Sequence, residues 1–115
     1  MSQTVIEKQR ALLDSMLRNI DGVKGVYYQP PSITRIQYPC IIYSLNDISS
    51  MYGDDRRYLS FPTYEIVLMD YDPESIIQKY IMDLDNGCYI RFNRYYTSDN
   101  LNHWVYELTF SKNLW

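Results

Sequence analysis

The spacing of apolar residues changes near Gly22, and this change restricts the possible folds more than any other feature. Before Gly22, apolar residues recur three and four positions apart between Val5 and Ile20, with charged residues on the other side. Thr4 and Glu7 have the spacing of a capping box. After Gly22, short runs rich in β-branched and aromatic residues follow one another, as in strands. We therefore expect an amphipathic helix followed by a sheet.

A second helical pattern interrupts the strand-like runs. Asp72-Pro73-Glu74 offers a cap, a first-turn proline and an acidic first turn, and Gly87 marks the end. Its expected apolar stripe is Ile76, Ile77, Tyr80, Ile81 and Leu84. Strands are expected at 25–29, 40–45, 64–69, 88–94 and 103–110. The order α-β-β-β-α-β-β predicts an α+β fold, a mostly antiparallel sheet with two helices packed on one face.

Residues 1–115 are expected to form a single domain, since the chain length falls within the usual range for one. The segment 46–60 differs from its neighbours because it is polar and contains Gly53 and the charged run 54–57. A connection of this length in a small domain is usually functional or mobile. We therefore expect a long arm or loop there.

The net charge, the first residues of the chain and the length of its apolar runs argue against several classes of protein. The formal net charge of −3 disfavours a protein dedicated to binding duplex nucleic acid. The first residues lack the basic stretch and apolar run of a signal peptide, and no apolar run is long enough to span a bilayer. We expect Cys40 and Cys88 to be free thiols in a chain made in the cytoplasm.

Three short motifs have some features of catalytic or metal-binding sites. Residues 52–55, Tyr-Gly-Asp-Asp, resemble the metal-binding turn of polymerase palms, but the chain lacks the length of a palm domain, so a solvated loop tip is expected. Residues 70–74 place acids at calcium-loop spacing without the glycine and glutamate that complete such a loop. His103 has no candidate nucleophile nearby in sequence and is expected to be structural or at an interface. We therefore expect no enzyme, metal or cofactor.

Tyrosine is unusually abundant, with 13 in the chain beside 3 Phe and 2 Trp. Tyrosine is favoured at protein interfaces because its ring is apolar and its hydroxyl is polar. Tyr89 and Arg91 are expected to share one strand face, which leaves two interpretations: a surface for a partner protein, or a stacking platform for single-stranded nucleic acid. The tyrosines expected in the core are Tyr43, Tyr64, Tyr80 and Tyr106.

Four strings in a fixed order give the chain a family resemblance. They are Val-Tyr-Tyr-Gln-Pro-Pro at 26–31, Tyr-Pro-Cys-Ile-Ile-Tyr at 38–43, Asp-Tyr-Asp-Pro at 70–73 and Phe-Asn-Arg-Tyr-Tyr-Thr-Ser-Asp-Asn-Leu-Asn-His at 92–103. With these strings the chain resembles the small tail-completion, or tail-terminator, proteins of tailed bacteriophages and prophages. The resemblance extends over residues 5–111.

The resemblance implies a structural part of the virion that is made in the host cytoplasm. Such proteins form a ring, typically a hexamer, which caps the head-proximal end of the tail tube and joins it to the head connector. The implied partners are further copies of the chain, the tail-tube protein and the head-connector protein. DNA passes through the lumen without specific binding, and no membrane is involved. A head-closure or connector component of the same joint is the alternative.

A ring of identical subunits needs two different contact patches on each subunit. The abundant tyrosines are expected to supply these patches, and the arm at 46–60 is the candidate segment for reaching a neighbouring subunit or the tail tube. The residues expected at the interface are Tyr52, Asp54, Asp55, Arg56, Arg57, Tyr58, Tyr89, Arg91 and Tyr95.

Overall fold

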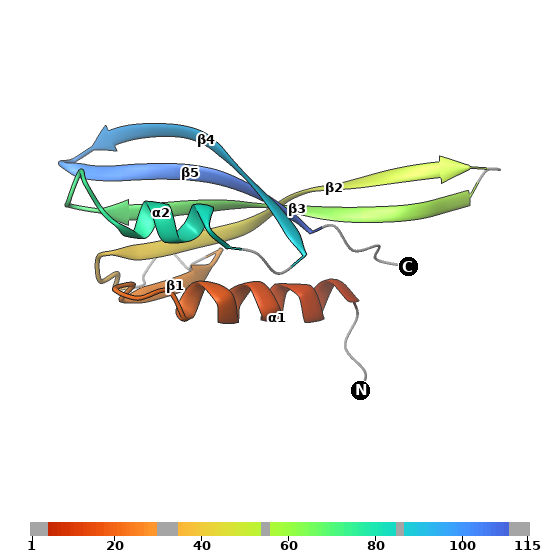
Figure 1. Ribbon diagram of the computed structural model, residues 1–115, viewed down its shortest axis with the longest axis horizontal. Helices are drawn as coiled ribbons and strands as arrows, with labels where there is room; N and C mark the ends of the chain where they lie inside the picture. The colour runs from red at the N-terminus through yellow and green to blue at the C-terminus, as the bar shows by residue number, and fades with distance from the viewer. Residues whose placement is uncertain (1–4, 30–34, 54–55, 85–86, 111–115) are drawn as a thin grey trace.

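A mixed sheet of five strands carries both helices on one of its faces (Figure 1). The computed structural model describes residues 5–29, 35–53, 56–84 and 87–110, and for residues 5–6 and 47–61 it describes the backbone alone. The elements are α1 (Val5–Arg18), β1 (Gly25–Tyr28), β2 (Cys40–Gly53), β3 (Arg56–Asp70), α2 (Ile77–Met82), β4 (Cys88–Ser98) and β5 (Leu101–Phe110). The predicted α+β class and the predicted order of elements are both confirmed.

The strands are arranged in the order β1-β2-β3-β5-β4. β1 runs parallel to β2, and the pairings of β2 with β3, β3 with β5, and β4 with β5 are antiparallel. A two-residue turn joins β4 to β5, with φ of 55° at Asp99 and 64° at Asn100. Asp and Asn tolerate this left-handed conformation, which matches the twist of the strands they connect. Among the described strands, β4 therefore pairs with β5 only and lies at the outer edge of the sheet.

The main core lies between the helices and the sheet. α1 contributes Leu13 and Leu17, the turn that follows it contributes Ile20, and α2 contributes Ile77 and Ile81. The sheet side of this core is Val26, Ile41, Tyr43, Tyr64, Ile66, Leu68, Trp104, Tyr106, Leu108 and Phe110. The last four are alternate residues of β5, as period-two patterning predicts.

Two positions on α1 differ from the expected stripe. Leu12 is 44% exposed, and the buried positions of the helix include Gln9. The buried positions Gln9, Leu13, Met16 and Leu17 lie on a single helical face, rotated slightly from the predicted one. The side chains of Val5 and Ile6 and the predicted cap Thr4 lie outside the described residues.

A smaller cluster lies on the opposite face of the sheet. Cys40, Met69 and Leu101 are buried there, with Ile36 and Tyr38 of the β1–β2 connection packed against them. This connection explains why Cys40 and Ile41, neighbours in β2, are both fully buried. Both cysteines are free thiols. The β1–β2 connection therefore covers one end of the helix-free face.

The expectation of a loop at 46–60 is wrong. β2 continues to Gly53 and β3 begins at Arg56, so the two strands stay paired far beyond the rest of the sheet. We call residues 46–53 and 56–62 the arm. Figure 1 shows this two-stranded ribbon projecting away from both helices, and the molecule measures 51 × 31 × 24 Å. The expectation that this segment forms a protruding arm holds, but the arm is a β-ribbon.

The second helix is shorter than predicted. It begins at Ile77, and Ile76 is its N-cap. The carboxylate of Asp72 accepts a hydrogen bond from the backbone N–H of Glu74 at 2.9 Å, which holds a turn before the helix. Only Ile77 and Ile81 of the expected stripe are buried, whereas Ile76 and Tyr80 are exposed. The expectation of Tyr80 in the core is therefore wrong.

Candidate subunit interface

The outer edge of β4 is the longest strand edge on the body of the molecule. β4 has 11 residues and comes last in the strand order, with β5 on its inner side. Within residues 5–29, 35–53, 56–84 and 87–110, no strand pairs with its outer side. Such an edge presents a row of backbone donors and acceptors that another strand can join.

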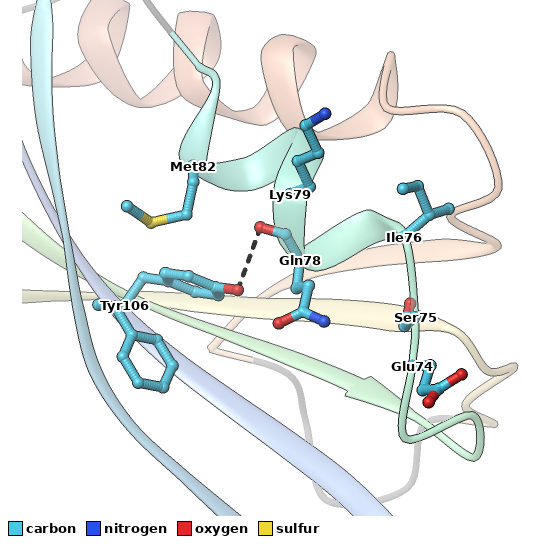
Figure 2. A pocket seen from close by; sticks show the side chains of 8 residues that line it. Glu74, Ser75, Ile76, Gln78, Lys79, Met82 and Tyr106 are labelled. Atoms are coloured by element: carbon cyan, nitrogen blue, oxygen red, sulfur yellow. Dashed lines mark hydrogen bonds between the residues drawn. The ribbon is translucent and has the colours of Figure 1, made fainter.

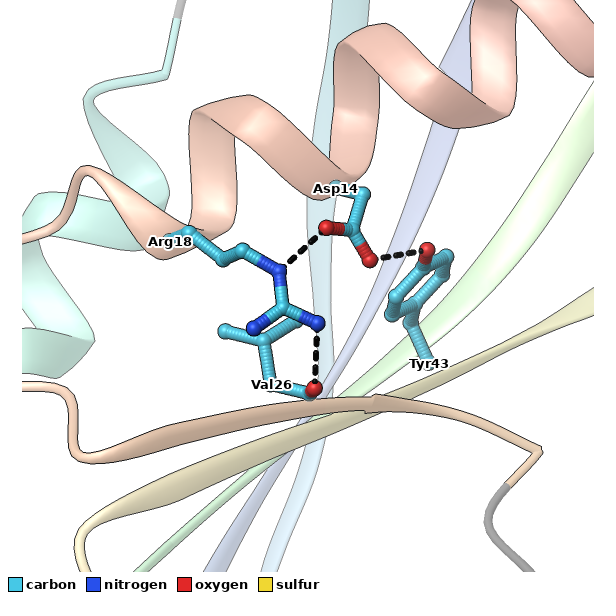
Figure 3. Close-up of polar contacts among 4 residues, drawn as sticks. All are labelled: Asp14, Arg18, Val26 and Tyr43. Atoms are coloured by element: carbon cyan, nitrogen blue, oxygen red, sulfur yellow. Dashed lines mark hydrogen bonds and ion pairs between the residues drawn. The ribbon is translucent and has the colours of Figure 1, made fainter.

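The opposite edge of the sheet is short and partly closed. β1 has only four residues. The guanidinium of Arg18 lies beside it, and its Nη2 donates a hydrogen bond to the carbonyl oxygen of Val26 at 2.9 Å (Figure 3). A side chain on the edge carbonyl competes with an incoming strand. The two edges of the sheet are therefore unequal, and β4 is the more accessible one.

The same arginine belongs to a polar cluster that fastens α1 to the sheet. Arg18 also forms an ion pair with Asp14, whose second carboxylate oxygen accepts a hydrogen bond from the Tyr43 hydroxyl at 2.7 Å (Figure 3). Arg10 lies 4.5 Å above the centre of the Tyr28 ring on the same side. Burial acts to raise the pKa of Asp14, but the hydrogen bonds from Tyr43 and Arg18 outweigh it and hold that pKa below its ordinary value.

We expect Asp14→Asn to lower the free energy of unfolding by about 1–3 kcal/mol at neutral pH, since it removes a charged acceptor from two donors. The pKa of Asp14 is depressed in the folded protein. The Asp14 carboxylate therefore stabilises the fold at pH values above the ordinary carboxyl pKa, and this stabilisation is lost as the pH falls through the pKa that Asp14 has in the folded protein. Urea unfolding at neutral and acidic pH should show the difference between the two proteins shrinking in acid. A difference that grows in acid would contradict the assignment.

An apolar hollow lies beside β4 on the helix face of the sheet. It has a volume of about 400 Å³ and lies between α2 and β4. Figure 2 shows Met82 and Tyr106 on one side of it and Ile76 and Glu74 on the other. The Tyr106 hydroxyl donates a hydrogen bond to the carbonyl oxygen of Gln78 at 3.3 Å, which fixes α2 over β5.

Three large apolar side chains remain exposed around this hollow. Ile76 is 56% exposed, and Met82 and Phe92 are each 45% exposed. The Phe92 ring packs edge-on against Tyr106, with 5.6 Å between ring centres. The sequence pattern does not predict these residues as contact residues: it places Ile76 in the core stripe of the second helix, and Phe92 on the strand face opposite Tyr89 and Arg91. Grouped exposed apolar side chains are a feature of interaction surfaces.

The other face of β4 carries aromatic and basic side chains. Tyr89 is 72% exposed, and Arg91 forms an ion pair with Glu107 of β5 at 2.7 Å. Further along β4, the Tyr96 ring stacks on His103 with 4.5 Å between ring centres and 9° between planes. Arg94 lies 5.7 Å from the centre of the same Tyr96 ring.

This face is less suited to stacking nucleic-acid bases than the sequence suggests. Arg91 is engaged by a carboxylate, and one face of the Tyr96 ring is occupied by His103. The His103 ring is further fixed by a hydrogen bond of 3.0 Å between Nδ1 and the carbonyl oxygen of Leu101. The arrangement of His103 is the structural one that the sequence predicts. Base stacking needs open ring faces and free cations.

The predicted interface residues fall into two groups. The structure brings Tyr89, Arg91 and Tyr95 together on β4, with Tyr89 and Arg91 on one face, as predicted. Tyr95 lies on the other face, where its ring packs on Trp104 and its hydroxyl donates to Asn102. Asp54 and Asp55 lie outside the described residues. So do the side chains of Tyr52, Arg56, Arg57 and Tyr58, whose backbones belong to the arm.

The described part of the chain contains no group of three or more His, Cys, Asp or Glu residues placed to hold a metal ion. None of its helices is long and apolar enough to cross a bilayer.

No family model and no curated protein matches this chain.

Proposed function

We propose that this chain is a structural protein of a phage or prophage virion that caps the head-proximal end of the tail tube as a ring and joins the tail to the head. The four ordered strings from residue 26 to residue 103 motivate the proposal. Its partners are then further copies of itself, the tail-tube protein and the head-connector protein. The protein acts within the virion, at the junction of head and tail.

The observation that carries the proposal is that one small domain has two separate strand edges, on the arm and on β4, with no partner strand among the described residues. The arm projects from one end of β2 and β3, and β4 forms the outer edge of the sheet on the far side of β5. A closed ring is built from heterologous contacts, in which each subunit uses two different surfaces that fit each other. The arm and the β4 edge are two such surfaces.

The charge of the chain also suits this role. The formal net charge is −3, and the two basic residues of β4 are both engaged with neighbouring side chains. A lumen that bound phosphates tightly would slow the passage of DNA, since every phosphate contact adds to affinity. An acidic ring allows DNA to pass without being retained.

The proposal is tested by electron microscopy of phage particles produced without this protein. A terminator is expected to leave overlong or unattached tails beside filled heads, and supplying the intact chain from a plasmid should restore particles of normal length. The alternative, a head-closure component, is expected to leave heads that leak DNA beside tails of normal length. Normal, infectious particles in the absence of the protein would contradict both roles.

A further inference from the structure

The β2 strand of the arm has a long edge with no partner strand among the described residues. Parallel pairing with β1 ends at Tyr43, whereas β2 continues to Gly53. On the other side of the arm, pairing of β3 with β5 reaches only as far as Thr63 and Thr109. The next residue of the arm, Pro62, has no backbone N–H to offer to a strand.

A ribbon of two strands is marginally stable in water by itself. A third strand pairing with either edge would satisfy further backbone groups and bury one side of the ribbon. The arm therefore has a thermodynamic reason to add to another strand. Its Pro62 makes the β3 edge the poorer choice, which leaves the β2 edge.

The β4 edge is the other strand edge of comparable length. It cannot pair with β2 of the same molecule, because β3 and β5 lie between them in the sheet. The partner strand must therefore come from another molecule. The short β1 edge, occupied by Arg18, is the weaker acceptor.

The charges of the strands favour pairing of β4 with the β2 side of the arm. β4 contains Arg91 and Arg94 and no acidic residue. The arm portion of β2 contains Asp47 and no basic residue, whereas the arm portion of β3 begins with Arg56 and Arg57. Opposite charges across paired strands stabilise them and like charges destabilise them.

We infer that the β2 edge of the arm of one copy adds to the outer edge of β4 of a second copy, head to tail. A strand added there extends the sheet past β4 and covers the exposed apolar side chains beside it, Phe92 and Met82 among them. This inference rests on the proposed ring and specifies which strands join neighbouring subunits.

Two variants of the full chain separate the two halves of this contact. In the first, residues 50–60 are replaced by Asn-Gly, which joins the register partners Ser49 and Phe61 through a two-residue turn. In the second, Tyr89→Asp and Phe92→Asp place charges on both faces of β4. The matched control is Leu12→Asp on α1, because Leu12 is 44% exposed and Phe92 45%. Circular dichroism verifies the fold of each protein.

Native mass spectrometry over a range of concentrations gives the test. Each variant alone should associate at least about 30-fold more weakly than the wild type, the effect of losing a central interface residue. An equimolar mixture should form a one-to-one dimer and nothing larger, since the intact arm of one variant meets the intact β4 of the other. The Leu12→Asp control should assemble as the wild type does.

Hydrogen exchange adds an independent readout. Backbone amides in 44–53 and 88–98 should gain protection when the wild type assembles, and those of β1 should not. Variants that assemble as the wild type does, or a mixture that stays monomeric, would overturn the proposed strand pairing. Neither outcome would contradict the proposed ring. A wild type that stays monomeric both in solution and on purified tail tubes would overturn the proposed ring as well.

Discussion

Raising the pH from 10 to 12 should unfold this protein, because its core contains tyrosines that resist ionisation. Burial raises the pKa of Tyr64 and of Tyr106 to about 12 from the ordinary value of 10.0, and it raises the pKa of Tyr43 as well. A group whose folded pKa is raised stabilises the fold below the unfolded pKa and loses that contribution as the pH rises through the folded value. Each tyrosine should remove about 1.4 kcal/mol per pH unit between these limits.

Together, Tyr64 and Tyr106 should lower the free energy of unfolding by roughly 5 kcal/mol over this range, which is comparable with the total stability of a small domain. Urea unfolding at a series of alkaline pH values measures the slope, and the ultraviolet absorbance of ionised tyrosine shows when the rings ionise. The rings should ionise together with unfolding.

Two substitutions isolate the effect of burial on the alkaline transition. Tyr106→Phe should cost about 1 kcal/mol at neutral pH, since it loses the hydrogen bond to Gln78, and should flatten the alkaline slope. Tyr89→Phe is the control, because Tyr89 is 72% exposed and its removal should leave the slope unchanged. Equal slopes for wild type and Tyr106→Phe would show that this buried hydroxyl does not drive the transition.

The parts of the fold that the sequence predicts well are those in which one face of an element is buried. β5 places Trp104, Tyr106, Leu108 and Phe110 at alternate positions because its inner face packs in the core with both helices, although Val105 on its other face is buried too. α1 repeats at helical spacing for the same reason. Where only one face of a helix or strand is buried, apolar residues recur in the sequence with the period of that element.

The sequence predicts a long arm or loop at 46–60 but not its β-ribbon structure, because that cause of periodicity is missing there. Neither helix lies over the ribbon, so its residues have no common inner face on the body of the protein (Figure 1). Ser49 and Ser50 interrupt any alternation, and the pairing shifts register between Met51 and Tyr52. The polar composition of segment 46–60 suggests a loop. A β-ribbon that projects from the body of the protein needs polar residues as well, so composition does not distinguish the two.

The candidate interface was predicted in part, and for a similar reason. Tyr89 and Arg91 were placed on one exposed face from local alternation alone. That β4 lies at the edge of the sheet depends on the strand order, which local patterns do not specify. Phe92 follows the core pattern of its strand yet is exposed, because α2 ends at Met82 and leaves the hollow beside it uncovered.

Replacing Asn102 by Asp should destabilise the protein by about 3 kcal/mol and loosen the β4 edge in particular. The buried amide of Asn102 donates to the carbonyl oxygens of Asp70 at 3.1 Å and Tyr71 at 3.2 Å. Its oxygen accepts hydrogen bonds from Tyr95 and Thr97 of β4. A carboxylate keeps the acceptor but leaves two carbonyls without their donor, each costing about 1–3 kcal/mol.

The pH dependence distinguishes this cause from a general packing defect. Burial beside two carbonyl oxygens raises the pKa of the introduced carboxyl group, so the deficit should be largest at neutral pH and shrink in acid, where the protonated group donates to one carbonyl. In acid the Asn102→Asp variant itself therefore recovers stability. The Asp14→Asn deficit also shrinks in acid, but for another reason: protonation of Asp14 removes its stabilising effect from the wild type.

The control Asn93→Asp, at an exposed position of β4, should change stability by less than about 0.5 kcal/mol. Faster hydrogen exchange in residues 94–98 of Asn102→Asp, with α1 unaffected, would show that this amide holds the edge strand; a deficit independent of pH would contradict that assignment.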